Sequence, residues 1–368
     1  MRDDVGRHGG SGHQVESPDG GDESRGWGPP FVGPKDQPVS TYFLPCNRNK
    51  ESVALDLKSG LGRDTLARLV TRADVLLENF RPGVLDRLGF PVERLHELNP
   101  RLVVLSITGF GHDGPEGGRA GYDQIAQGEA GLMSLTGQDA DHPQRGGVPI
   151  ADLLAGMYGA YGVLAALHER DRTGRGRVVR TSLLASIVGV HGFQGTRYTV
   201  AGEVGRASGN HHPSICPYGL FSCADGMIQL ACGSESLWRK LAAGFGLDAD
   251  APGLVTNRER VHNRDAVVAL IHAAFAQVSL SELLERLDEL GIPAGEVRTL
   301  DRVYEWEQTR SQGLAIDVEH PLLGSIKIPG PPIRLDNNDF AGGRAAHTHP
   351  PLLGEHTDSV LAWLDATD

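Results

Sequence analysis

The spacing of apolar residues alternates between two patterns along the first half of the chain. Short apolar runs typical of buried strands lie at 52–57, 74–78, 102–108 and 177–181. Apolar residues at helical spacing lie between and beyond these runs, at 60–73, 84–88, 92–98, 122–135 and 152–169. Strands that alternate with helices predict βαβ units and a parallel sheet. The pattern therefore predicts an α/β fold whose large domain is doubly wound and Rossmann-like.

The second half of the chain has a different pattern. An Asp225-Gly226 pair between two apolar runs signals a hairpin, and helical spacing follows at 236–245, 264–277 and 279–290. We therefore expect a smaller α+β domain at 215–305. The large domain would consist of residues 41–190 together with the tail at 310–368.

Two segments carry no periodic apolar pattern. Residues 1–40 are rich in Gly, Pro, Asp and Ser, which predicts a poorly structured, atypical N-terminus rather than a packed element. Within this segment, Trp27 and Phe31 are large aromatic residues that we expect to pack against another part of the protein. Residues 191–214 are interpreted as a linker between the two domains.

Composition narrows the class of protein. The 368 residues carry a net charge of -12 and are 39% hydrophobic, which is enough for two domains and argues against a nucleic-acid surface. The longest apolar stretch contains an acid and several glycines, which favours a buried helix over a membrane span. The four cysteines show neither a zinc nor a disulfide pattern, which indicates reduced thiols in a cytoplasmic protein. The histidines lack the fixed spacing of a metal site.

A single carboxylate, Asp152, stands near the start of an apolar run of small residues that extends to Leu167. Placing an acid there is costly unless it is hydrogen-bonded or takes part in chemistry. One interpretation is a helix N-cap, in which the carboxylate accepts hydrogen bonds from backbone amides. The other is a nucleophile that attacks a thioester or phosphoester and forms a covalent intermediate. The local pattern leaves both interpretations open.

A turn at Asn79-Phe80-Arg81-Pro82-Gly83 follows the strand expected at 74–78. Ligands bind at the carboxyl ends of parallel strands, so this turn is either part of a ligand site or an ordinary connection. Basic residues on the acidic background form either a phosphate clamp or a solvated face: Arg48, Lys50, Lys58, Arg81 and Arg87. The glycines at 109–114 lack a strand–turn–helix context, which argues against NAD binding.

Several motifs in a fixed order resemble the class III coenzyme A transferase family, which includes formyl-CoA transferase, carnitine CoA-transferase and alpha-methylacyl-CoA racemase. They extend from about residue 23 to the end of the chain. Among them are Asn47-Arg-Asn-Lys50, Ala73-Asp-Val-Leu-Leu-Glu-Asn-Phe-Arg-Pro-Gly83, Pro149-Ile-Ala-Asp152, Thr173-Gly-Arg-Gly176 and Pro351-Leu-Leu-Gly-Glu-His-Thr357.

The resemblance implies an acyl-CoA:carboxylate CoA-transferase in which Asp152 is the catalytic aspartate and forms a covalent intermediate. The partners would be an acyl-CoA and a carboxylic acid, with the CoA thioester as a substrate and no tightly bound cofactor or metal. Family members form interlocked homodimers, so we expect a homodimer. The family's CoA contacts fall on Leu55, Asp56, Leu57, Lys58, Asn79, Phe80, Arg81, Arg87, Ala120, Gly121, Tyr122 and Asp123.

Tyr122 discriminates between activities within the resemblance. The racemases of the family carry a histidine at this position, as the second acid–base group beside the aspartate. A phenol with a pKa near ~10 replaces imidazole poorly at neutral pH. Transfer is therefore favoured over racemisation.

The start of the chain departs from the family pattern. Members begin with a strand, a Gly-Pro turn and a helix, and only Gln14-Val-Glu16 matches the end of that unit. We expect a truncated or replaced first βα unit, which would leave an edge or a gap in the sheet. Two alternatives to transfer stay open: an acyl-CoA racemase or epimerase, and an N-terminally truncated, non-catalytic member.

Overall fold

The computed structural model describes residues 11–334 and 346–366. Packing divides the chain into two compact units. The first unit is built from residues up to Ala130, Gly147–Gly192 and residues from Tyr304 onward, and the second from Gly131–Gly146 and Phe193–Val303. Residues 131–146, which we expected in the large domain, thus pack with the second unit.

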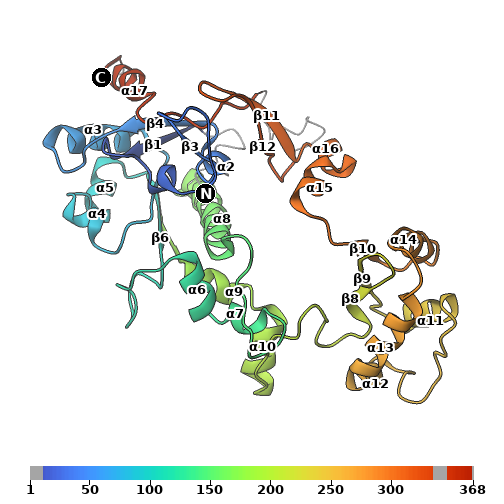
Figure 1. Ribbon diagram of the computed structural model, residues 1–368. Helices are drawn as coiled ribbons and strands as arrows, with labels where there is room; N and C mark the ends of the chain where they lie inside the picture. The colour runs from blue at the N-terminus through green and yellow to red at the C-terminus, as the bar shows by residue number, and fades with distance from the viewer. Residues whose placement is uncertain (1–10, 335–345, 367–368) are drawn as a thin grey trace. The chain divides into compact units, whose positions relative to one another are not determined.

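The first unit contains parallel strands, as predicted, but in two sheets rather than one (Figure 1). A three-stranded parallel sheet has the order β5-β6-β7, from β5 (Val75–Glu78), β6 (Val103–Thr108) and β7 (Val178–Ser182). A two-stranded parallel sheet pairs β1 (Gly12–Glu16) with β4 (Lys50–Ala54). A sheet is continuous only where strand edges come within hydrogen-bonding distance, and no described strand joins these two.

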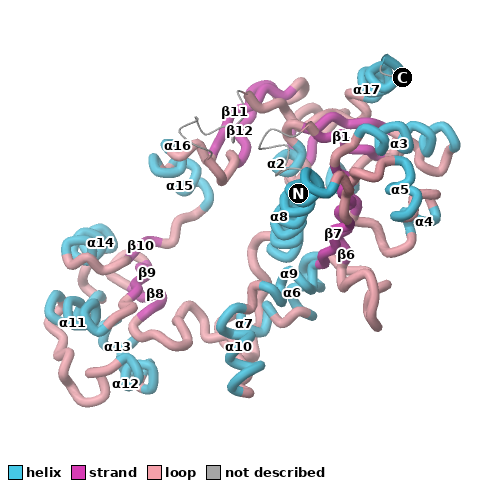
Figure 2. Tube along the Cα trace, turned by 180° about the vertical axis from the view of Figure 1, so that it is seen from behind, coloured by secondary structure: helices cyan, strands magenta, loops and turns pink. Residues whose placement is uncertain are grey.

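Successive residues of a strand point to opposite faces of the sheet, and both faces of the three-stranded sheet carry apolar side chains. Helices therefore cover both faces. Helix α8 (Ile150–Thr173) packs on one face, where Val163 and Ala166 meet Val103 and Leu105. On the other face, Val104 packs with α3 (Gly60–Arg72) and α5 (Val92–Leu98). Figures 1 and 2 show β6 between α8 and these two helices.

The segment before residue 40 differs from our expectation, because it contains ordered elements. Besides β1, it forms a short 3-10 helix at Glu23–Gly26 and a hairpin of β2 (Phe31–Val32) and β3 (Val39–Ser40). The pairing of β1 with β4 and a buried salt bridge, 2.7 Å between Arg25 and Glu16, hold this segment, and apolar periodicity reveals neither contact. The prediction of a poorly structured N-terminus also covers residues 1–10, which lie outside the described residues.

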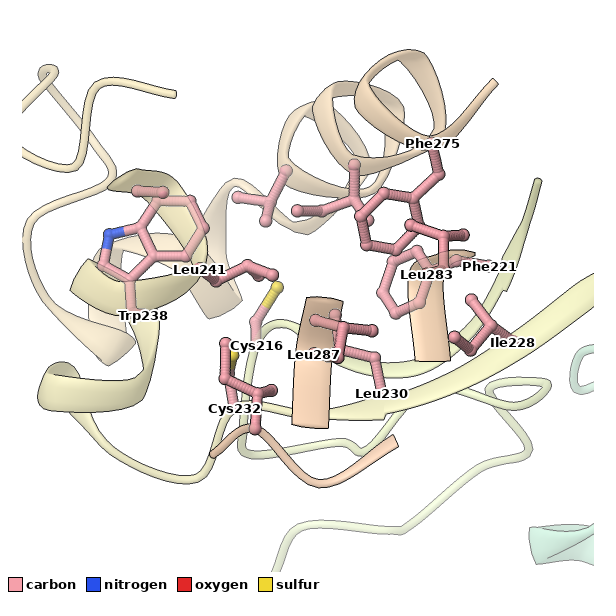
Figure 3. Packing of buried hydrophobic residues seen from close by; sticks show 14 of the residues in the cluster. Cys216, Phe221, Ile228, Leu230, Cys232, Trp238, Leu241, Phe275, Leu283 and Leu287 are labelled. Carbon is pink, nitrogen blue, oxygen red and sulfur yellow. The ribbon is translucent and has the colours of Figure 1, made fainter. Parts of the chain in front are cut away.

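The second unit has its own core around an antiparallel sheet of order β10-β9-β8 (Figure 3). Its strands are β8 (Tyr218–Ser222), β9 (Met227–Ala231) and β10 (Ala294–Glu296). The expected hairpin at Asp225-Gly226 joins β8 to β9. Four helices surround it: α11 (Glu235–Gly244), α12 (Asn257–His262), α13 (Arg264–Phe275) and α14 (Leu280–Glu289).

Two further expectations are corrected. The helix expected over 122–135 is divided into α6 (Asp123–Glu129) and α7 (Leu132–Leu135), because Gly131 adopts a left-handed φ of 81° that ends the first helix. The linker expected at 191–214 contains the helix α10 (Gly192–Ala201). None of its residues is buried, so no apolar stripe marked it.

The remaining elements complete the chain. They are α2 (Leu44–Asn47), α4 (Val84–Arg87), α9 (Leu183–Gly189), α15 (Leu300–Glu305), α16 (Glu307–Ser311), the hairpin of β11 (Ala315–His320) and β12 (Gly324–Pro329), and α17 (Thr357–Ala366).

Candidate active site

Asp152 lies in the first turn of α8, where three backbone N–H groups have no partner within the helix. A carboxylate at this place commonly accepts one of those hydrogen bonds. The Asp152 side chain accepts none from any residue that the structure describes, and α8 has no side-chain cap from the residue before it. The N-cap interpretation of Asp152 is therefore not the arrangement observed.

A second carboxylate caps α8 in its place. Asp123, at the start of α6, accepts the N–H of Ala151 at 2.7 Å and that of Asp152 at 3.4 Å through Oδ1. Its Oδ2 accepts a hydrogen bond of 2.7 Å from Gln127. Asp123 thus stabilises the helix start and leaves both oxygens of Asp152 available for chemistry.

The surroundings hold Asp152 in an unusual electrostatic state. Although part of the residue is open to solvent, the protein packed around the carboxylate displaces water from it. This loss of hydration, together with the nearby negative charge of Asp123, raises the pKa of Asp152 from 3.8 to about 6. At neutral pH the carboxylate remains mostly ionised, and the partial loss of hydration that raises its pKa also favours its reaction as a nucleophile.

Tyr42 is a neighbour of this site that no sequence motif marks. Burial raises its pKa, and the charges of Asp152, Cys46 and Asp123 raise it further, so the phenol stays neutral close to the two carboxylates. The rings of Trp27 and Tyr42 meet in a T-shaped contact, with centroids 4.9 Å apart. Trp27 therefore packs as expected, and its contact positions Tyr42. No local pattern linked residue 42 to residue 152.

The loop after β6 brings the expected Ala120–Asp123 contacts to the start of α6. Gly109 and Gly121 pass so closely that a Cβ on Gly109 would lie 2.7 Å from the Gly121 nitrogen, so both positions require glycine. Tyr122 precedes α6 and is 64% exposed. The loop between Gly109 and Gly121 thus returns to the end of β6 at which it begins, and the side chain of Tyr122 is accessible there.

The turn expected to bind CoA follows β5 at the same edge of the three-stranded sheet. Asn79, Phe80 and Arg81 are exposed, and Gly83 takes a left-handed φ of 78° before α4. The guanidinium of Arg87 lies close to this turn. A Cβ placed on Gly83 would be 3.3 Å from its Nη1. Exposed donors from the turn and from α4 are thus available to one ligand.

The segment Leu55–Lys58 follows β4 and has mixed exposure. The side chain of Leu55 is buried in the core of the first unit, and Leu57 packs against that core. Asp56 and Lys58 are exposed, and the Asp56 carboxylate accepts the N–H of Lys58 at 2.9 Å. Any ligand contact of Leu55 would therefore come from its backbone.

The described residues contain no group of three or more His, Cys, Asp or Glu side chains arranged to hold a metal ion. His212 of the second unit stacks between Phe193 and Tyr218, with ring centroids 5.8 and 5.2 Å apart. The His212 ring thus takes part in aromatic packing within the second unit.

Comparison with known proteins decides the family. The family model described as CoA-transferase family III matches residues 13–357. The chain belongs to CoA-transferase family III. The resemblance inferred from the motifs is thereby confirmed.

Family III members with named activities are similar over nearly the whole chain. Succinyl-CoA:glutarate CoA-transferase of Homo sapiens is 35% identical, covering 95% of this chain and 78% of the human protein. Succinate--glutarate CoA-transferase of Agrobacterium fabrum is 36% identical, covering 96% and 89% respectively. Among solved structures, a CAIB/BAIF family protein from Brucella suis is 37% identical with a TM-score of 0.86, covering 98% of this chain and 95% of that one.

Proposed function

We propose that this family III protein is an acyl-CoA:carboxylate CoA-transferase that works through a covalent intermediate on Asp152. The observation that carries the proposal is the division of labour between two carboxylates. Asp123 caps α8, whereas Asp152 accepts no hydrogen bond from the described residues and has a pKa raised to about 6. A carboxylate held in this state is suited to nucleophilic attack, and a merely structural acid would not be.

The proposed reaction exchanges activated acyl groups without an outside energy source. The Asp152 carboxylate attacks the thioester carbonyl of the donor, the C–S bond breaks, and CoA leaves as a thiolate with a mixed anhydride formed. The thiolate then attacks the Asp152 carbonyl, which releases the donor acid and forms an aspartyl-CoA thioester.

The second half of the reaction repeats these steps with the acceptor. The acceptor carboxylate attacks the aspartyl-CoA carbonyl, displaces the CoA thiolate and forms a new anhydride. The thiolate attacks the acceptor's carbonyl of that anhydride, which gives the new acyl-CoA and returns Asp152 as a free carboxylate. Every bond that breaks is thus replaced by one of similar energy.

The binding of CoA is proposed for the exposed residues around the sheet edge. Asn79, Phe80, Arg81 and Arg87 offer hydrogen-bond donors and a planar ring, and the two guanidinium groups suit phosphate. Leu55, Asp56, Leu57 and Lys58 would add a cation and backbone groups. Ala120 stands where family members often carry a basic residue, so this chain would bind CoA with one fewer cation at that point.

The relatives support dicarboxylic acids as substrates. The similar proteins of Homo sapiens and Agrobacterium fabrum are named for succinyl or succinate and glutarate. We propose succinyl-CoA as the donor and a dicarboxylic acid of similar length as the acceptor.

The test is a transfer assay with succinyl-CoA and a panel of dicarboxylic and hydroxy acids, analysed by separation of the CoA thioesters. The wild-type chain should form a new thioester with at least one acid, and Asp152→Ala should form none. An Asp152→Ala protein with full activity would overturn the proposed role of Asp152. Exchange of the α-hydrogen of a 2-methylacyl-CoA with deuterium, without transfer, would favour the racemase alternative.

We also propose that the protein is a homodimer. By length and composition α8 is the one unbroken helix of the described residues that could cross a membrane, and α13 and α14 pass the same test only as a bent pair. One face of α8 packs on β6 and β7. The opposite face exposes a stripe of large apolar side chains at helical spacing: Leu153, Met157, Tyr161 and Leu164. Such a stripe suits contact with a second copy.

Sedimentation velocity tests the dimer. We expect the wild-type chain to sediment as a dimer and the double variant Met157→Lys, Tyr161→Lys to shift toward monomer. Leu61→Lys is the matched control, because Leu61 is a single apolar residue 80% exposed on α3. A monomeric wild-type chain would contradict the proposal.

A further inference from the structure

The face of the three-stranded sheet that meets α3 and α5 changes character along the strands. Leu76, Val104 and Val178 stand side by side in register and pack against the core. One step nearer the carboxyl ends, Glu78, Ser106 and Arg180 stand side by side instead. A polar row thus begins near the carboxyl ends of the strands, and on β5 it stands directly before the turn at 79–83.

Within this row, hydrogen bonds connect three side chains. The hydroxyl of Ser106 donates to Oε1 of Glu78, and Nε2 of His112 lies 2.7 Å from the Ser106 oxygen. The single proton of Ser106 is directed to Glu78, so the bond from His112 requires Nε2 to carry the donated hydrogen. Burial and the charge of Arg180 lower the pKa of His112, with Asp113 opposing them, so the ring is neutral near neutral pH.

The chain of bonds ends on the backbone of the turn. Oε2 of Glu78 accepts the N–H of Phe80 at 2.8 Å. Ser106 is buried and fixed on the central strand, so it can hold the Glu78 carboxylate in one orientation. Ser106 and His112 are thus connected to the backbone of Phe80 by hydrogen bonds that pass through Glu78.

We propose that His112 and Ser106 are positioning residues that hold the Asn79–Arg81 turn, through Glu78, in the conformation that binds CoA. This inference rests on the proposed function, since it assigns to the turn the role of a CoA contact. Without the chain of bonds, the carboxylate of Glu78 could rotate away from the Phe80 N–H. The turn would then lose its orientation before CoA arrives.

The variant that tests the inference is His112→Ala, with His112→Gln as its conservative partner. In His112→Ala we expect the KM for succinyl-CoA to rise about fivefold with kcat little changed, since one hydrogen bond of a positioning chain is lost. In His112→Gln the side-chain amide can still donate to Ser106, so the KM should return toward the wild-type value. Ser106→Ala should behave as His112→Ala does.

The matched control is His96→Ala. His96 is also half-buried and also hydrogen-bonded near β6, with 3.1 Å between Nε2 and the carbonyl of Leu102, but at the opposite end of the strand. It should leave the KM for succinyl-CoA unchanged. An unchanged KM in His112→Ala, an equal rise in His96→Ala, or a failure of His112→Gln to restore binding would each overturn the inference.

A measurement without ligand separates the two proposals. Hydrogen exchange followed by mass spectrometry should show faster exchange of the Phe80 amide in His112→Ala and Ser106→Ala, and wild-type exchange in His96→Ala. A wild-type chain without transfer activity would overturn the proposed function, while the Phe80 amide would still show whether His112 holds the turn. Unchanged exchange in His112→Ala would overturn the inference even in an active enzyme.

Discussion

At the scale of single residues, Asp152 and Asp123 divide two tasks that one carboxylate often performs alone. Asp123 accepts the backbone N–H groups at the start of α8, and Asp152 accepts no hydrogen bond from the described residues. Its raised pKa follows first from lost hydration and then from the charge of Asp123. Both causes act on the ionised form, which is the form that the proposed reaction uses.

The rate of transfer should therefore report the protonation of Asp152. Because the carboxylate must be ionised to attack, kcat/KM for succinyl-CoA should be nearly constant above about pH 7 and fall about tenfold per pH unit below the pKa of about 6. Steady-state rates between about pH 4.5 and pH 8 measure this limb. A profile that stays flat down to pH ~5 would show that Asp152 titrates near its ordinary value.

Stability should change in the opposite direction from activity when Asp152 is replaced. A carboxyl whose pKa is higher in the folded state contributes stability that is present below the unfolded value and lost as pH rises through the folded value. Asp152→Asn should thus be more stable than wild type above pH ~6, by about 1 kcal/mol after discounting for solvent screening. Urea denaturation at several pH values should show this difference closing between pH ~6 and ~4. A variant less stable than wild type at neutral pH would contradict it.

At the scale of elements, the start of α8 depends on a residue from another helix. Asp123→Ala should cost about 1 kcal/mol in the free energy of unfolding, since it removes the cap of α8. Asp123→Asn keeps a side-chain oxygen that can accept the Ala151 N–H and should cost less. In both variants the lost charge should move the acid limb of kcat/KM to lower pH.

The measurement is the pH at which kcat/KM of the two variants begins to fall. The rate itself is not diagnostic, because Asp123 is also a proposed CoA contact and its loss can lower the rate at every pH. Burial remains after the substitution, so the pKa of Asp152 should stay above 3.8. Urea denaturation of the two variants gives the cost of the cap. A limb that moves to higher pH would contradict the electrostatic coupling of the two carboxylates.

Much of the arrangement of elements could be predicted, because apolar periodicity is a local signal. The strands β5 and β6, the hairpin of β8 and β9, and α13 and α14 follow from spacing alone. Elements held by polar or long-range contacts could not be predicted from spacing. Strand β1 is held by its pairing with β4 and by the salt bridge between Glu16 and Arg25, and α10 buries no residue. The candidate site divides in the same way. Asp152 stands out in its own segment, whereas Asp123, which caps the helix that carries it, is 29 residues away.

At the scale of the whole molecule, one buried polar network ties the first residues of the described chain to its tail within the first unit. Oε1 and Oε2 of Glu16 accept from Arg25 at 2.7 Å each, and Oε1 also accepts from Ser52 at 2.6 Å. Arg25 in turn donates to the carbonyl of Pro351 at 3.1 Å, and Ser52 accepts the N–H of Gly354 at 2.8 Å. Segments more than 300 residues apart are thus fixed to the same strand pair.

This network should dominate the response of the fold to substitution. Burial alone would raise the pKa of Glu16, but hydrogen bonds from Arg25, Ser52 and the Asp22 N–H, with the charge of Arg25, lower it. Arg25→Met leaves a buried carboxylate without its partner and should cost about 3–5 kcal/mol in the free energy of unfolding. The double variant Glu16→Leu, Arg25→Met removes both charges and should recover part of that loss.

The same network sets an acid limit on stability. A carboxyl whose pKa is lowered in the folded state contributes stability above its unfolded value, near pH ~4.3, and this is lost as pH falls through the folded value. Urea denaturation from about pH 7 to pH 3 should show a larger loss of stability below pH ~4.3 in wild type than in the double variant. Arg94→Met is the control, because Arg94 and Glu97 form an exposed pair 3.1 Å apart whose loss should cost less than about 1 kcal/mol. An Arg25→Met protein as stable as Arg94→Met would show that the tie between the first residues and the tail does not hold the fold together.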